Sequence, residues 1–293
     1  MAAPAEPALP WSKKPLTLRL ISAAVLIPIV VAAVYSGHPA WDLLVVLFGV
    51  VMAWEWSRIA ARSRPSVSPP ARWSASIVSP LLVGILLLAY AFRDALPPLL
   101  EPLSRPGFTL AVIVVATAYA LPHYRLASLW FGLGVTYVAI PCIAIIALRA
   151  DPDLGLQQIL WIVALVIAAD TGAYIAGRSI GGPKLAPRIS PKKTWAGLFG
   201  AVVSAAIVGA ITAFVLDLAD AWALTALSGG LALVEQAGDL AESAFKRYFG
   251  VKDTSNIIPG HGGALDRVDG LIAVAAAVAG INYLIGSSVL TWL

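Results

Sequence analysis

Ionisable side chains crowd into residues 239–269 of a chain that is otherwise strongly apolar. They comprise acids, bases and one histidine: Asp239, Glu242, Lys246, Arg247, Lys252, Asp253, His261, Asp266, Arg267 and Asp269. Such groups are costly near hydrocarbon, so a dense cluster between apolar segments indicates a functional site. Carboxylates bind Mg²⁺, and Lys and Arg bind phosphate oxygens. The mixture predicts a site for metal ions and phosphates; the alternative is a solvated loop of paired charges.

The spacing of these residues places several of them on shared helix faces. On a helix through 239–247, one face holds the residues at i, i+3, i+4 and i+7, namely Asp239, Glu242, Ser243 and Lys246. Asp266 and Asp269 are likewise three apart, at the start of the last apolar segment. Two such helices could bring Asp239 and Asp266 together around divalent cations. Between them, the glycines of PGHGG (259–263) would let a phosphate approach the backbone.

The segment SPKKT (190–194) is a second candidate. Ser190 and Pro191 are typical of an N-cap and a first helical position, so we expect a helix to begin there. Lys192, Lys193 and Thr194 would then occupy its first turn, where basic residues oppose the helix dipole. A bound polyphosphate would remove that conflict. The alternative is a basic anchor at the cytoplasmic end of a membrane helix.

Asp170 lies inside the apolar segment 157–178, on one helical stripe with Tyr174 and Arg178. A regular helix puts it about 12 Å from the end of that segment. A carboxylate there must face protein or water. It is either part of the site or a structural partner of Arg178 or of another basic residue.

The elements that carry these residues are predicted to be membrane helices. The chain has 293 residues, of which 59% are hydrophobic and 12% charged, with mean hydropathy +0.85. Soluble domains carry about 25% charged residues, and a membrane span needs roughly 20 apolar ones. We therefore expect an all-α polytopic membrane protein with about nine spans, near 16–36, 39–60, 74–93, 107–121, 127–148, 157–178, 195–217, 221–236 and 270–292.

The basic residues predict the orientation. With the N-terminus in the cytoplasm, 17 of the 20 Lys and Arg residues fall on the inner side, as the positive-inside rule requires. We expect a multi-pass protein of the inner (cytoplasmic) membrane with its C-terminus outside. The net charge of +4 then follows from the inner loops, and no nucleic-acid partner is expected. Glu55, near a helix end, is expected to reach the membrane interface, and the alternative is a role within the membrane.

The chain divides into two parts of different character. Residues 1–150 read as apolar scaffold helices, whereas 151–293 form a catalytic membrane region with cytoplasmic loops 178–194 and 237–269.

At the clustered residues the sequence resembles the phosphatidate cytidylyltransferases, or CDP-diacylglycerol synthases. The motif reads Ser243-x-x-Lys246-Arg247, Lys252-Asp253, His261-Gly262-Gly263 and Asp266-Arg267-x-Asp269. GDLxES (238–243), SPKKT and the stretch from Asp170 to Arg178 also match. The resemblance covers roughly residues 165–270.

The resemblance implies that CTP and phosphatidate react to give CDP-diacylglycerol and pyrophosphate at the cytoplasmic membrane face. It implies one or two metal ions, Mg²⁺ and a second that could be monovalent, and a homodimer among membrane lipids. The implied catalytic residues are the metal ligands Asp239 and Asp266, together with Lys192, Lys193 and Lys246. Implied substrate contacts are Arg178, Ser190, Thr194, Ser243, Arg247, Lys252, His261, Gly262, Gly263 and Arg267. Asp170, Glu242, Asp253 and Asp269 would orient these groups or hold another ion.

Two other functions remain open from the residues. A CTP-dependent polyprenol or phytol kinase could share the scaffold, but it would need a base for a neutral alcohol and would release CDP. A cation-coupled transporter could use Asp170 and Asp239 as an ion path, but it leaves the PGHGG and SPKKT segments unexplained.

Overall fold

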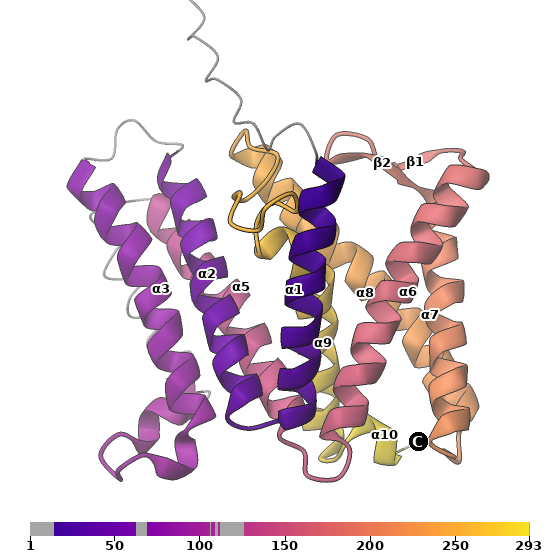
Figure 1. Cartoon of the computed structure of the whole chain (residues 1–293), viewed down its shortest axis with the longest axis horizontal. Coiled ribbons are helices and arrows are strands. Elements are labelled where there is room, and N and C mark those ends of the chain that lie inside the picture. The colour runs from indigo at the N-terminus through magenta and orange to yellow at the C-terminus, as the bar shows by residue number, and fades with distance from the viewer. Residues whose placement is uncertain (1–14, 63–68, 106, 109–110, 112–125, 293) are drawn as a thin grey trace, which may run out of the picture.

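The computed structural model describes residues 15–62, 69–105, 107–108, 111 and 126–292 and forms a bundle of long helices (Figure 1). The helices are α1 (Pro15–Ser36), α2 (Ala40–Arg62), α3 (Pro69–Ala91), α5 (Leu126–Arg149), α6 (Gly155–Ser179), α7 (Trp195–Val215), α8 (Ala221–Tyr248), α9 (Leu265–Ile285) and α10 (Val289–Trp292). Short 3-10 turns, η2 (Arg93–Ala95) and η3 (Glu101–Ser104), follow α3. Most of the predicted helix 107–121 lies outside the described residues.

Six helices in the described part of the chain are long and apolar enough to cross a membrane. They lie at Thr17–Ser36, Ala40–Ala61, Trp130–Arg149, Gly155–Ser179, Trp195–Val215 and Leu265–Ile285. A shorter apolar helix covers Ser76–Ala91. The expected all-α membrane architecture is therefore confirmed, while the number of nine spans and the orientation remain predictions.

The bundle has two packed groups of helices and one helix between them. Helices α2, α3 and α5 pack together, as do α6, α7 and α8, and α9 contacts α5, α6 and α8. Glycines allow α6 and α7 to lie especially close, because a Cβ on Gly172 would lie 2.5 Å from the Gly200 carbonyl oxygen. This contact fixes the ends of α6 and α7, between which the SPKKT segment lies.

The connections that carry the candidate site residues share one end of the bundle. Figure 1 shows a hairpin after α6, the segment between α8 and α9, and the start of α1 at that end. Helix α10 and the C-terminus lie at the opposite end. Residues far apart in the sequence therefore meet at one end of the bundle.

The SPKKT segment forms a strand, so the predicted helix start at Ser190 is wrong. Strand β1 (Lys184–Ala186) pairs antiparallel with β2 (Ser190–Thr194). The helix begins at Trp195, and Thr194 is its N-cap, because its Oγ1 accepts a hydrogen bond from Gly197 N at 3.0 Å. Pairing with β1 outweighs the local Ser-Pro helix signal, and Pro191 is tolerated because a two-stranded hairpin has edge strands only.

Candidate active site

Helix α8 presents the predicted row of polar side chains on one face. Lys246 Nζ lies 2.5 Å from Glu242 Oε2, and Ser243 Oγ donates a hydrogen bond to Asp239 Oδ1 at 3.2 Å. Glu242 is buried and forms this ion pair without a hydrogen bond. Burial raises the pKa of Glu242 to about 8, although the ammonium of Lys246 favours the carboxylate. The spacing prediction for this face is confirmed.

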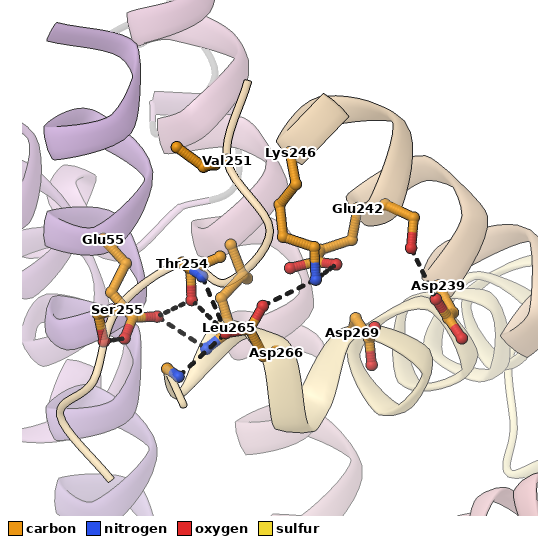
Figure 2. Close-up of polar contacts among 12 residues, drawn as sticks. Glu55, Asp239, Glu242, Lys246, Val251, Thr254, Ser255, Leu265, Asp266 and Asp269 are labelled. Atoms are coloured by element: carbon orange, nitrogen blue, oxygen red, sulfur yellow. Dashed lines mark hydrogen bonds and ion pairs between the residues drawn. The ribbon is translucent and has the colours of Figure 1, made fainter. Parts of the chain in front are cut away.

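Asp266, in the first turn of α9, is held from three directions (Figure 2). Lys246 Nζ lies 2.8 Å from its Oδ1. Its Oδ2 accepts hydrogen bonds from Thr254 N at 2.9 Å, Thr254 Oγ1 at 3.0 Å and Gly263 N at 3.0 Å. The segment 249–264 thus folds over α9 with its backbone donors directed at Asp266. Lys246 connects the carboxylates of Glu242 and Asp266, as Figure 2 shows.

The acids of α8 and α9 form one group, because Asp269 interacts electrostatically with both Asp239 and Glu242; Figure 2 shows Asp269 beside them. Within the part of the chain that the structure describes, Asp269 Oδ1 accepts a hydrogen bond from the adjacent Gly270 N, at 2.9 Å. The described residues contain no set of three His, Cys, Asp or Glu side chains arranged as a metal cage. Mg²⁺ needs only one or two protein carboxylates when water and substrate phosphate complete its shell. The donor set therefore fits an ion that is bound together with a phosphate.

A polar cavity of about 280 Å³ lies beside Asp239, between α6, β2, α7 and α8. Lys193 Nζ contacts Asp239 Oδ2 at 2.7 Å and Gln236 Oε1 at 2.8 Å. The predicted residues brought to its wall are Asp170, Arg178, Lys192, Lys193, Thr194 and Asp239. The structure thus joins SPKKT to the acidic group, which the sequence could place only as separate segments.

Asp170 and Arg178 both line this cavity, and among the described residues they form no ion pair with each other. The pair of Asp170 with Arg178 that the sequence suggested is therefore not present among the described residues. Two further polar residues were not predicted. Gln236 is buried and donates through Nε2 to the buried Glu235 at 2.7 Å. The sequence feature that could have indicated them is the presence of two adjacent polar residues in the otherwise apolar first part of α8.

The PGHGG turn is held by α1. Arg19 Nε donates to the Gly260 carbonyl oxygen at 2.8 Å, and Ser22 Oγ is hydrogen-bonded to His261 Nδ1 at 2.7 Å. Gly262 adopts φ +97°, which favours glycine. Partial burial, followed by the nearby charges of Arg267 and Arg19, lowers the pKa of His261. The imidazole is therefore neutral near pH 7.

Some predicted residues lie away from these contacts. Lys252 and Asp253 are exposed and make no ion pair or side-chain hydrogen bond with other described residues. Arg267 is exposed as well. Arg247 donates to the carbonyl oxygens of Ile189 at 3.4 Å and Val251 at 3.2 Å. Arg247 thus braces the hairpin against the segment after α8.

Glu55 of α2 is the main residue whose position was predicted wrongly from the sequence. It is completely buried instead of reaching the interface, and it accepts hydrogen bonds from Ser255 and from backbone N–H groups at the start of α9. The available signal was a carboxylate in an apolar helix, which requires a polar partner. That partner lies about two hundred residues further along the chain, where local patterns give no indication.

Residues 17–285 match the model of a family described as "Cytidylyltransferase family". A protein of Brucella suis biovar 1 named phosphatidate cytidylyltransferase is 36% identical over 273 residues, 93% of each chain. One of the same name from Pseudomonas aeruginosa is 33% identical over 274 residues, 92% of this chain and 97% of the other. A third, from Haemophilus influenzae, is 32% identical over 290 residues, 87% and 94% of the two chains.

Proposed function

The chain belongs to the cytidylyltransferase family, and we propose that it converts CTP and phosphatidate into CDP-diacylglycerol and pyrophosphate. Relatives that share most of its length are named phosphatidate cytidylyltransferases. The observation that carries the proposal is the contact between Lys193 and Asp239. It joins the cavity lined by Arg178, Lys192 and Lys193 to the acidic group of α8 and α9, as a reaction between two phosphates requires.

The cavity beside Lys193 is the proposed CTP site. Lys192, Lys193 and Arg178 border it with three positive charges, which suit the β- and γ-phosphates and the pyrophosphate that leaves. The positive end of the α7 dipole adds to this attraction. Asp170 lies on the same wall and is proposed to orient the basic groups.

Phosphatidate is proposed to approach from the side of Lys246 and Arg267. Its phosphate oxygen attacks the α-phosphorus of CTP, and the bond to the pyrophosphate breaks in line. Because the attacking phosphate is ionised at neutral pH, no general base is needed, which agrees with a neutral His261 that only holds its turn. Alignment and charge neutralisation are the main tasks of the site.

Asp239 and Asp266 are proposed to hold Mg²⁺, with Asp269 and Glu242 orienting them. The ion would neutralise phosphate oxygens of both substrates when bound. Lys246 keeps Asp266 in place through their 2.8 Å contact, and Lys193 does the same for Asp239.

The site end of the bundle is proposed to face the cytoplasm, where CTP is found. Seventeen of the 20 basic residues lie in segments 1–72 and 125–267 and fall on the predicted inner side, and Arg149, within the second segment, falls on the outer side. In this orientation, acyl chains stay in the inner leaflet while the phosphate reaches Lys246. The proposal includes nine spans and a C-terminus outside.

The test follows the products that purified protein forms from CTP, phosphatidate and Mg²⁺. Wild type should give CDP-diacylglycerol and pyrophosphate, and Asp266→Asn should lose on the order of 10²–10³-fold in kcat. Asp42→Asn, which changes a buried acid at the opposite end of the bundle, should retain activity. CDP formed with a lipid alcohol would indicate a kinase. No nucleotide turnover in folded protein would favour a transporter.

A further inference from the structure

Glu55 is a completely buried carboxylate that, among the described residues, accepts four hydrogen bonds, each from the segment 254–265 (Figure 2). Its Oε1 accepts from Ser255 Oγ at 2.5 Å and Ala264 N at 2.9 Å. Its Oε2 accepts from Leu265 N at 2.8 Å and Thr254 Oγ1 at 3.2 Å. A buried charge is tolerated only where its lone pairs are satisfied. Glu55 therefore requires this segment to be closed over it.

We propose that Glu55 is a positioning residue that sets the place of Asp266, so that a scaffold helix of the N-terminal half controls the geometry of the active site. Glu55 itself touches neither substrate nor metal. The proposal rests on the proposed function, because Asp266 is assigned there as a metal ligand.

One connection runs through the N-terminus of α9. Ala264, at the N-cap position, has no side chain that can accept a hydrogen bond, so the first N–H groups of α9 need another acceptor. Glu55 supplies two carboxylate oxygens for the N–H groups of Ala264 and Leu265. It acts as a cap from a distant helix, and its charge also suits the positive end of the α9 dipole. Asp266 is the next residue.

The second connection runs through Thr254. Its hydroxyl lies 3.2 Å from Glu55 Oε2 and 3.0 Å from Asp266 Oδ2. Its backbone N–H donates to Asp266 at 2.9 Å. A hydroxyl has a single hydrogen to donate, so the two carboxylates share it. A displacement of Glu55 would therefore alter the contacts of Asp266 directly.

The glycine at 263 provides the space for this arrangement. A Cβ there would lie 1.9 Å from Thr254 Oγ1 and 2.6 Å from Glu55 Oε1. Gly263 N in turn donates to Asp266 Oδ2 at 3.0 Å. The last glycine of the PGHGG turn, Gly263, is thus required by the contact between Glu55, Thr254 and Asp266.

Neighbours of Glu55 fix α2 against the same region. Trp56 stacks on Phe245 of α8, with ring centroids 3.7 Å apart, and its Nε1 donates to the Trp130 carbonyl oxygen at 2.7 Å. Arg58 Nη2 donates to the Thr254 carbonyl oxygen at 3.0 Å. Because these contacts hold the helix, the carboxylate of Glu55 stands at a fixed point relative to α8 and α9.

The test is Glu55→Gln with Asp42→Asn as the matched control on the same helix. Each Glu55 oxygen accepts one backbone N–H, so a glutamine must turn its NH₂ group toward one of them in either orientation. We expect kcat to fall about 10–100-fold, as for groups that orient metal ligands, and the Mg²⁺ dependence to move to higher concentration. Asp42→Asn should change neither quantity more than about twofold.

A second pair of variants separates positioning from general loss of structure. Thr254→Val removes the shared hydroxyl with little change of shape, whereas Thr254→Ser keeps the hydroxyl and removes only the methyl group. We expect Thr254→Val to need a higher Mg²⁺ concentration for activity and Thr254→Ser to behave almost like wild type. The double variant Glu55→Gln, Thr254→Val should lose less activity than the product of the two single losses.

Amide hydrogen exchange without substrates gives a readout independent of turnover. Glu55→Gln should speed exchange at residues 254–266 and leave α6 and α7 unchanged. If Glu55→Gln left exchange at residues 254–266 unchanged, or had the same Mg²⁺ dependence as wild type, the proposal would be overturned. If wild type made no CDP-diacylglycerol, the proposed function would fail, whereas the exchange result would still decide whether Glu55 holds the segment around Asp266.

Discussion

The two ends of the bundle both carry charged side chains but pair them differently. At the end opposite the site, His38 Nδ1 lies 2.7 Å from Asp42 Oδ2 and Arg105 lies 2.8 Å from Glu101, each pair four residues apart. At the site end, Lys193 pairs with Asp239 and Lys246 with Asp266, from different elements, and Lys246 also pairs with Glu242 four residues earlier on α8. Local pairs stabilise their own helix end, whereas pairs between elements fix the relative positions of several elements.

This difference helps to distinguish a functional cluster from ordinary charged loop residues. Exposed pairs at helical spacing contribute little and can form wherever a helix meets water. Buried charges supplied by separate helices need mutual compensation, so their geometry is specified closely. Arg149 shows that a long-range contact can also be structural, since it donates hydrogen bonds to the carbonyl oxygens of Val34 and Tyr35 at the end of α1. The presence of several mutually dependent carboxylates marks the site end.

The largest effect among these comparisons is expected from the hairpin lysines. Lys193→Gln removes the ammonium that contacts Asp239 and Gln236 and should lower kcat/KM for CTP on the order of 10²-fold. Lys192→Gln removes an exposed ammonium at the rim of the same cavity and should cost several-fold less. Steady-state kinetics with varied CTP measure both. Equal losses would show that the contact with Asp239 has no special importance.

Gly263→Ala tests how tightly the segment over Asp266 is packed. The added Cβ would collide with Thr254 and Glu55, and overpacking of this kind costs about 1–3 kcal/mol. We expect a lower thermal midpoint in detergent, monitored by tryptophan fluorescence, together with reduced activity. Gly280→Ala on α9 is the control, because its Cβ meets no atom within 4 Å, and it should be neutral. Two equally stable variants would contradict the close packing described for this segment.

The smallest effect is expected at the opposite end. Glu101→Gln breaks the exposed pair with Arg105, a class of interaction that contributes roughly 0–1 kcal/mol. The thermal midpoint should change little, and activity should stay within about twofold of wild type. A large loss of activity would mean that this charge pair affects the active site at the other end of the bundle. The distinction between local pairs at one end and functional pairs at the other would then be wrong.

The sequence predicted contacts between residues that are close together in the chain better than contacts between distant residues. The face formed by Asp239, Glu242, Ser243 and Lys246 follows from helical spacing, and the structure confirms it. The start of α7 was predicted wrongly, because pairing of β2 with β1 overrode the local helix signal at Ser190. The roles of Gln236 and Arg247 depend on residues of other elements and left no local pattern.

Composition and helical periodicity are local properties, so the amino-acid sequence was enough to predict apolar membrane helices and a polar face on α8. The contact of Glu55 with the segment beside Asp266, and that of Lys193 with Asp239, became visible only in the folded chain. Those contacts are made between elements that are distant in the sequence. These contacts form because buried charges must be compensated when the helices pack. The order of residues along the chain does not indicate which charged side chains will meet.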